Sequence, residues 1–179
     1  RGYVQYQLRH YDLALDDFNQ AIRFQPENPR NYHWRGCANR QLHNFDDALA
    51  DHERALSFEP DNATFVNHRG ITYDYLEDYQ SAIADYSRAI ELDGADPAFF
   101  SNRAGDYREI GQYDLAIADH NQAIKRDPKN PDLYNQRGLT YDRMNKRNEA
   151  IADYSHAIKL SPKVGTYYAN RGDDYRILE

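Results

Sequence analysis

Residues 63–96 read ATFVNHRGITYDYLEDYQSAIADYSRAIELDGAD, and this sequence pattern recurs along the chain every 34 residues. Glycine recurs at this interval, at Gly2, Gly36, Gly70, Gly138 and Gly172. The one position of the series without glycine is Ala104. Alanine recurs at this interval as well, at Ala14, Ala48, Ala82, Ala116 and Ala150. Independent series that share one period do not arise from composition alone. The chain is therefore predicted to be a tandem repeat protein.

Each repeat has the pattern of two helices. In residues 80–92, apolar side chains follow one another at intervals of three and four, as one face of a helix requires. Residues 64–77 form the preceding helix, and no segment alternates as a half-buried strand would. All seven prolines fall at junctions between repeats, where a helix ends or begins. We expect the second helix of four repeats to be capped by Asp12, Asp46, Asp114 and Asn148.

The repeated glycine needs a physical reason, because glycine inside a helix costs about 0.5–1 kcal/mol relative to alanine. Close approach of two helix backbones would compensate for that cost. We expect the alanine series of the second helix to face the glycines. Large aromatic side chains such as Phe18, Tyr86 and Tyr154 would then fill the space above and below.

A 34-residue unit of two helices with Gly at position 8, Tyr at 11, Ala at 20 and 27 and Pro at 32 resembles the tetratricopeptide repeat (TPR). The resemblance divides one array, residues 1–179, into a partial unit 1–28, complete units 29–62, 63–96, 97–130 and 131–164, and a partial unit 165–179. It implies an all-α fold, a right-handed α-solenoid of eleven helices. Ala104 for Gly and His52 and His120 for an aromatic residue are modest departures from the family pattern.

Composition excludes several classes of protein. The chain holds 22 Lys and Arg against 29 Asp and Glu, a net charge of -7, whereas nucleic-acid binders carry the opposite balance. Most of the 16 tyrosines occupy framework positions of the repeat, which predicts core rather than base stacking. The mean hydropathy is -0.99, and no apolar run approaches the roughly 20 residues that a membrane span needs.

No catalytic motif, phosphate-binding loop or dinucleotide-binding turn is recognisable. The chain is therefore expected not to be an enzyme and to need no cofactor. His33 and Cys37 stand one helical turn apart and could supply two metal ligands. With no third ligand in the sequence pattern, we interpret them as a polar pair lining a groove and expect no metal site.

Two charged series also follow the repeat, from Arg1 to Arg171 in the first helices and from Asp17 to Asp153 in the second. A basic stripe for a ligand is one interpretation. Pairing of Arg with Asp between neighbouring helices is the favoured one, because the two series share a period and have opposite signs. The sequence leaves open whether the partner lies in the same repeat or the next.

The resemblance to TPR proteins implies that positions 2, 5, 6, 9, 12 and 13 of each unit line a concave groove built from first helices. These positions vary here, as a ligand surface on a fixed framework would. The predicted partner-binding residues are Arg40, Asn67, His68, Asp74, Tyr75, Asn102, Arg108, Asn135, Gln136, Asp142, Asn170 and Arg176.

Two patterns stand out among these residues. Carboxamides recur at positions 5 and 6, where an amide can both donate to and accept from a peptide backbone. Their row resembles, incompletely, the asparagine ladder in the repeats of the glycosyltransferase that transfers N-acetylglucosamine to proteins. Position 12 alternates in charge from Arg40 through Asp74 to Arg176. The alternation indicates either mutual neutralisation along the wall or a ligand that is itself mixed in charge.

The clamp by which some TPR co-chaperones grip acidic chaperone tails is not recognisable. Position 5 holds His33, Asn67, Ser101, Asn135 or Ala169, where that clamp uses Lys, and position 9 is never Asn. Asn102 alone matches the clamp. The predicted partner is a protein or peptide other than a chaperone C-terminal tail.

The function predicted from the sequence is a non-catalytic scaffold that binds an extended or helical segment of a partner protein. Two alternatives stay open. One is a self-association module, and the other is the targeting domain of a larger enzyme. The chain begins at Arg1 rather than Met and both end repeats are partial, so we expect an excised piece with unpaired ends. The compartment is left open, with the cytoplasm favoured.

Overall fold

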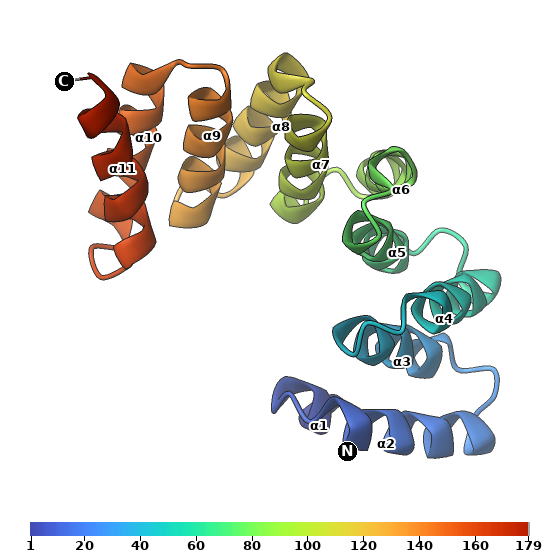
Figure 1. The fold of residues 1–179 in the computed structure, drawn as a ribbon. Coiled ribbons are helices and arrows are strands. Elements are labelled where there is room, and N and C mark those ends of the chain that lie inside the picture. The colour runs from blue at the N-terminus through green and yellow to red at the C-terminus, as the bar shows by residue number, and fades with distance from the viewer. Residues whose placement is uncertain (179) are drawn as a thin grey trace. The chain divides into compact units, whose positions relative to one another are not determined.

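The computed structural model describes residues 1–178, which form eleven α-helices and no strand (Figure 1). The helices, in chain order, are α1 (Gly2–Gln7), α2 (Tyr11–Phe24), α3 (Pro29–Gln41), α4 (Phe45–Phe58), α5 (Ala63–Tyr75), α6 (Tyr79–Leu92), α7 (Pro97–Glu109), α8 (Tyr113–Arg126), α9 (Pro131–Arg143), α10 (Arg147–Leu160) and α11 (Gly165–Leu178). The all-helical prediction is confirmed. In the repeat quoted above, the helices span 63–75 and 79–92, close to the expected 64–77 and 80–92.

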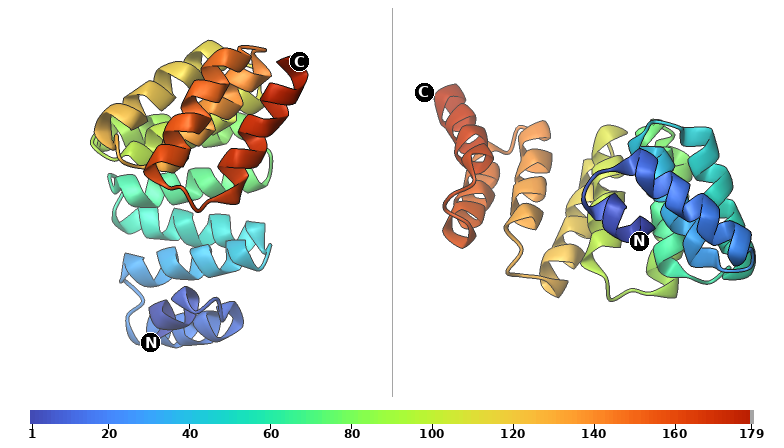
Figure 2. Two further views of the ribbon diagram at one scale, coloured as in Figure 1. Left: turned by 90° about the vertical axis from the view of Figure 1, so that its left-hand side faces the viewer. Right: turned by 90° about the horizontal axis from the view of Figure 1, so that it is seen from below.

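The chain divides into two compact units, Arg1–Leu92 with α1 to α6 and a second one from Asp93 onward with α7 to α11. Within each unit every helix packs on its neighbours in sequence, and the tightest pairs are α3 with α4, α5 with α6, α7 with α8 and α9 with α10. Figure 2 shows these pairs from two further directions. The first helix of a repeat also contacts the first helix of the next repeat, for example α3 with α5 and α9 with α11. Contacts confined to near neighbours are typical of a repeat solenoid.

In four helix pairs the second helix packs closely against a glycine of the first: Gly2, Gly36, Gly70 and Gly138. A Cβ on Gly70 would lie 2.8 Å from Cε1 of Tyr86, and one on Gly138 would lie 2.6 Å from Cε1 of Tyr154. The alanines of the second helices are fully buried, yet an aromatic ring occupies the space over the glycine. The ring takes the room that a side chain would need, as expected for these aromatic residues, and at Gly36 the backbone oxygen of Ala48 lies 3.1 Å from a Cβ placed there.

Helix starts differ between first and second helices. The side chains of Asn28, Asn62, Asp96 and Asn130 each accept a hydrogen bond from a backbone N–H in the first turn of a first helix. The caps expected at Asp12, Asp46, Asp114 and Asn148 are wrong, since these residues are the second residue inside their helices. The three aspartates there face the positive end of the helix dipole without capping it.

The turn inside each helix pair uses one left-handed residue, again at the 34-residue step. Arg9, His43, Glu77 and Asn145 have φ between 57° and 61°, and Gly111 has φ 77°. The residue after each of them donates its N–H back to the end of the first helix, as Gln112 N does to Tyr107 O at 2.8 Å. Only one of the five positions has the glycine that this conformation favours.

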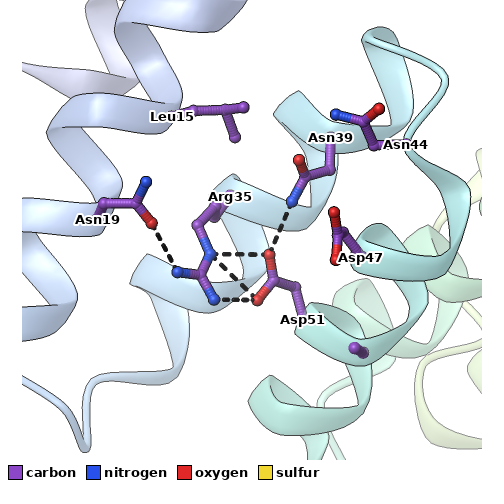
Figure 3. Close-up of a pocket in the computed structure, with 8 residues that line it drawn as sticks. Leu15, Asn19, Arg35, Asn39, Asn44, Asp47 and Asp51 are labelled. Atoms are coloured by element: carbon purple, nitrogen blue, oxygen red, sulfur yellow. Dashed lines mark hydrogen bonds and ion pairs between the residues drawn. The ribbon is translucent and has the colours of Figure 1, made fainter.

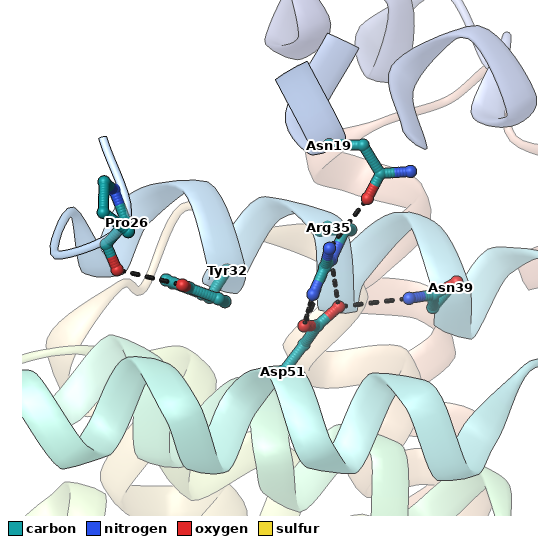
Figure 4. Close-up of polar contacts among 6 residues, drawn as sticks. All are labelled: Asn19, Pro26, Tyr32, Arg35, Asn39 and Asp51. Carbon is teal, nitrogen blue, oxygen red and sulfur yellow. Dashed lines mark hydrogen bonds and ion pairs between the residues drawn. The ribbon is translucent and has the colours of Figure 1, made fainter. Parts of the chain in front are cut away.

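The Arg and Asp series pair within each complete repeat. In the partial repeats, Arg1 lies 3.4 Å from Asp17, and Arg171 donates to Ser155 instead of an aspartate. Arg35, Arg69, Arg103 and Arg137 bind Asp51, Asp85, Asp119 and Asp153 at 2.6–2.7 Å, from the first helix to the second. The favoured interpretation is confirmed, although the aspartates are buried rather than exposed. Arg35 also donates to Asn19 of α2 at 2.7 Å, so one guanidinium joins three helices (Figure 3). In the same repeat, the Tyr32 hydroxyl donates to Pro26 O at 2.9 Å (Figure 4).

The tyrosines of the last helix do not follow the framework expectation. Tyr86 and Tyr154 are buried as predicted, but Tyr168 and Tyr175 on α11 are 43% and 49% exposed. None of the helices in residues 1–178 combines the length and the apolar character that crossing a membrane would require.

Candidate partner-binding face

The first helices carry all the predicted partner-binding residues, and neighbouring first helices lie against each other within each compact unit. We call this surface the first-helix face: α3 and α5 in the N-terminal unit, and α7, α9 and α11 in the C-terminal unit. Residues at positions 5, 6 and 12 of successive repeats meet along the seams between these helices. The contacts at those seams decide which side chains are open to a ligand.

In the N-terminal unit, Arg40 spans the seam from α3 to α5. Its Nη1 donates to the backbone carbonyl of His68 at 3.0 Å, and its guanidinium stands 5.9 Å from the ring centre of Tyr75. Arg40 is only 4% exposed and Asn67 only 5%. These two predicted residues therefore lie inside the seam, whereas Tyr75 is 49% exposed beside them.

The same seam holds a cluster of sulfur and imidazole groups. Cys37 Sγ lies 3.8 Å from Nε2 of His33, one turn before it on α3, and 3.3 Å from Nδ1 of His68 on α5. His33 and Cys37 are buried, and His68 is partly buried. The interpretation of His33 and Cys37 as two ligands without a third is wrong, because the seam brings in His68.

Burial shapes the protonation of this cluster. It lowers the pKa of His33 to about 3 and that of His68 to about 4, so both rings are neutral near pH 7. It raises the pKa of the Cys37 thiol to about 12, although the nearby charge of Arg40 opposes the rise. His52, behind them on α4, is fully buried, and its pKa is lowered in the same way.

In the C-terminal unit, amide side chains bind one another across the seams. Arg108 Nη1 on α7 donates to Gln136 Oε1 on α9 at 2.9 Å. Asn170 Nδ2 on α11 donates to Asn135 Oδ1 on α9, also at 2.9 Å. Each of these bonds uses one of the hydrogen-bonding groups that an amide offers. Asn102, Asn135, Gln136 and Asn170 are all partly exposed.

The charged residues of position 12 have local partners. Arg147, at the start of α10, binds Asp142 on α9 and Asp174 on α11 through the same Nη1, the latter at 2.9 Å. Arg176 lies 3.0 Å from Asp173 on its own helix. Arg40 and Arg108 bind a carbonyl and an amide, as described above. Neighbouring residues of other types thus take part in balancing the alternating charges.

A hollow of about 340 Å³ opens on the first-helix face of the C-terminal unit. It is lined by Pro97, Ala98, Ser101, Asn102, Asn130, Asp132, Leu133 and Gln136. Two of the predicted residues, Asn102 and Gln136, contribute amides to its wall. Asp132, at position 2 of its unit and so expected on the groove, also lines the hollow, and its carboxylate accepts a 2.5 Å hydrogen bond from the Tyr167 hydroxyl. The hollow therefore has polar groups on both sides.

Another hollow of about 390 Å³ lies between α2, α3 and α4 (Figure 3). Its walls include Asn19, Arg35, Asn39 and Asp51, which are bound to one another: Asn39 Nδ2 donates to Asp51 at 3.1 Å, and Arg35 bridges Asn19 and Asp51. These groups hold the repeats together. We therefore assign this hollow to the framework rather than to ligand binding.

Family models for tetratricopeptide repeats match most of the chain. A "Tetratricopeptide repeat" model covers residues 1–63 and 33–98, another covers 131–164, and a "TPR repeat" model covers 106–145. No curated protein matches. Proteins of this family are generally non-catalytic scaffolds.

Solved TPR structures share the fold. TTC0263 of Thermus thermophilus superposes with a TM-score of 0.82 at 20% identity, over 97% of this chain and 95% of that one. YrrB, described as a TPR protein with an unusual peptide-binding site, superposes with a TM-score of 0.75 at 19% identity, over 96% of this chain and 88% of YrrB. The first TPR of Spaghetti, bound to an HSP90 peptide, superposes with a TM-score of 0.62 at 24% identity, over 65% of this chain and 92% of that one. The repeat pattern, the helix pairs and these matches together place the chain in the tetratricopeptide repeat family.

Proposed function

We propose that this chain is a non-catalytic scaffold whose first-helix face binds an extended or helical segment of a partner protein. The observation that carries the proposal is the hollow of the C-terminal unit, where Asn102 and Gln136 present amides next to Asp132. Amides of this kind can hold a peptide backbone whatever its side chains. TPR structures with peptide sites, YrrB and Spaghetti, support the class of ligand.

The charges on this face favour a peptide of mixed charge. Arg108 lies on one side of the seam and Asp142 farther along α9, and both are partly exposed. A uniformly acidic segment would be repelled by Asp132 and Asp142, and a uniformly basic one by Arg108 and Arg143. A segment that alternates or is largely polar meets neither penalty.

A peptide-display selection on the immobilised chain tests the proposal. The first-helix variant is Asn102→Ala/Arg108→Glu, and its matched control is Asn148→Ala/Lys159→Glu, on exposed positions of α10. Selected peptides should bind the first-helix variant at least about tenfold more weakly, about 1.4 kcal/mol, and bind the control as they bind the parent chain. Equal affinities for parent and first-helix variant would contradict the proposal, provided that circular dichroism shows both variants folded.

A second candidate, self-association, rests on apolar side chains at the two outer helices. Their exposed members are Tyr3, Val4 and Leu8 at α1, and Tyr168, Tyr175, Ile177 and Leu178 on α11, each 43–58% exposed. Contiguous exposed apolar groups mark interaction surfaces. Sedimentation equilibrium over a hundredfold range of concentration distinguishes the two: a rising mass supports self-association, and a constant monomer mass excludes it in that range.

A further inference from the structure

We propose that the His33–Cys37–His68 cluster is a binding site for a thiophilic transition-metal ion of the Zn²⁺ type, which links the repeat of α3 to the repeat of α5. The site is distinct from the amide hollow of the C-terminal unit. One thiol and two imidazoles are donors that Zn²⁺ prefers, and three protein ligands leave a fourth position for a solvent molecule.

The distances fit such an ion. With metal–sulfur and metal–nitrogen bonds of about 2.3 and 2.0–2.1 Å at a tetrahedral angle, sulfur and nitrogen ligands lie about 3.5 Å apart. The observed separations from Cys37 Sγ are 3.8 Å to His33 and 3.3 Å to His68. All three donor atoms lie within 4.8 Å of one another.

The surroundings hold the donors in place. The His33 ring is stacked on Phe65, with ring centres 4.6 Å apart, and it is only 2% exposed. Arg40 donates to the His68 carbonyl and so fixes the backbone that carries the second imidazole. Neighbours that orient metal ligands are typical of built metal sites.

Buried polar atoms without a protein partner give a second, independent observation. His33 Nδ1 and both ring nitrogens of His52 have no hydrogen-bond partner, although both residues are buried. The His52 ring centre lies 5.6 Å from that of His33 and 6.4 Å from that of His68. Unsatisfied imidazoles are costly in a core that serves packing alone. They indicate that this seam is built to hold a polar or charged species.

A metal ion can reach the cluster from solvent, and its binding requires only the loss of one proton. A hollow of about 300 Å³, lined by His33, Trp34, Asn62 and Phe65 among others, opens beside the cluster. On binding, Cys37 gives up its thiol proton to solvent and the metal–sulfur bond forms, so no oxidant or reductant is needed.

Cobalt titration tests the proposal, because Cys37 is the only cysteine of the chain. Any thiolate-to-cobalt charge-transfer band must therefore come from this residue. We expect the chelator-treated protein to bind one equivalent of Co²⁺ with such a band, and added Zn²⁺ to abolish it. Zn²⁺ should also raise the melting temperature, since it stabilises the folded chain by mass action.

Three variants decide whether the proposed ligands are responsible. Cys37→Ser should abolish the band, and His68→Ala should weaken binding by more than about 100-fold, beyond the loss usual for outer neighbours. His156→Ala, an exposed histidine of α10, is the matched control and should leave binding unchanged. Absence of a thiolate band and of any Zn²⁺-induced shift in melting temperature in the parent chain overturns the proposal. Undiminished binding by a folded His68→Ala variant does so as well.

Discussion

Arg35 on α3 holds Asp51 on α4 with its Nη2 2.6 Å from Oδ1 and its Nε 2.9 Å from Oδ2, and the other complete repeats have the same pair. Both groups belong to one repeat, so the pair fixes the angle between its two helices. The additional bond from Arg35 to Asn19 reaches the preceding repeat. The pair thus acts both inside a repeat and between repeats, which explains why its two residues recur at the step of the fold.

Removing the carboxylate of such a pair should destabilise the chain. Asp85→Ala removes both hydrogen bonds of Arg69 at the half-buried contact between α5 and α6. We expect a loss of about 1–3 kcal/mol in the free energy of unfolding. Asp61→Ala removes the exposed partner of Arg88 and should cost no more than about 1 kcal/mol. Urea denaturation measures both. Equal effects of the two substitutions would contradict a structural role of the buried pair.

The glycine positions divide into those that need glycine and those that do not. Gly70→Ala places a methyl group 2.8 Å from Tyr86, so we expect a loss of about 1–3 kcal/mol through overpacking. Gly105 lies in α7 with no atom near its missing side chain, and Gly105→Ala should stabilise the chain by about 0.5–1 kcal/mol. Thermal melts of both variants check the opposite signs, and a stabilising Gly70→Ala would refute the packing account.

Helix caps give a third matched comparison. Asn130 accepts a hydrogen bond from Asp132 N at 3.0 Å, so Asn130→Ala should cost about 0.5–2 kcal/mol. Asn44 stands at the same place before α4 but its side chain makes no cap bond, and Asn44→Ala should change stability by less. Chemical denaturation measures the loss of stability in both variants. A larger loss for Asn44→Ala than for Asn130→Ala would contradict the assignment of side-chain caps to first helices.

Stability should fall in mild acid because His33, His52 and His120 are buried and His68 is partly buried. The pKa is lowered to about 3 for His33 and His120 and to about 4 for His68, and it is lowered also for His52. Below about pH 6.5 the unfolded chain therefore binds more protons than the folded one. His33, His68 and His120 each reduce the free energy of unfolding by about 2 kcal/mol between pH 7 and pH 5, since their folded pKa lies near 3 or 4.

The variant His120→Gln should lose about 2 kcal/mol less than the parent over that interval, whatever its stability at pH 7. His156→Gln, on the exposed side of α10, should keep the parent's dependence on pH. Urea midpoints at several pH values measure the difference. A dependence on pH that His120→Gln leaves untouched would show that this ring does not contribute.

The sequence could predict the fold because packing inside a repeat is local. Glycine, alanine and aromatic residues of one helix pair lie within one period, so their series locate both helices. The left-handed φ values of His43, Glu77 and Asn145 could not be found in this way, because the turn imposes them at a position whose residue type differs from repeat to repeat.

The candidate site was harder to predict, because its contacts join different repeats. Cys37 and His68 are 31 residues apart, which is one period less three, and Asn135 and Asn170 are one period plus one apart. Only the relative shift of neighbouring first helices brings these pairs together. That shift depends on how the helices pack and is not marked by any repeating residue. Burial of Arg40 and Asn67 in the seam has the same origin.

The most direct test of the proposed partner-binding face is an NMR titration of the ¹⁵N-labelled chain with a peptide selected by display. The side-chain amide signals of Asn102 and Gln136 report on the hollow itself. We predict that the largest shifts fall on these two signals and on backbone amides of α7 and α9. Shifts concentrated on α8 and α10, or on the exposed apolar residues of α1 and α11, with both side-chain signals unmoved, would contradict the account.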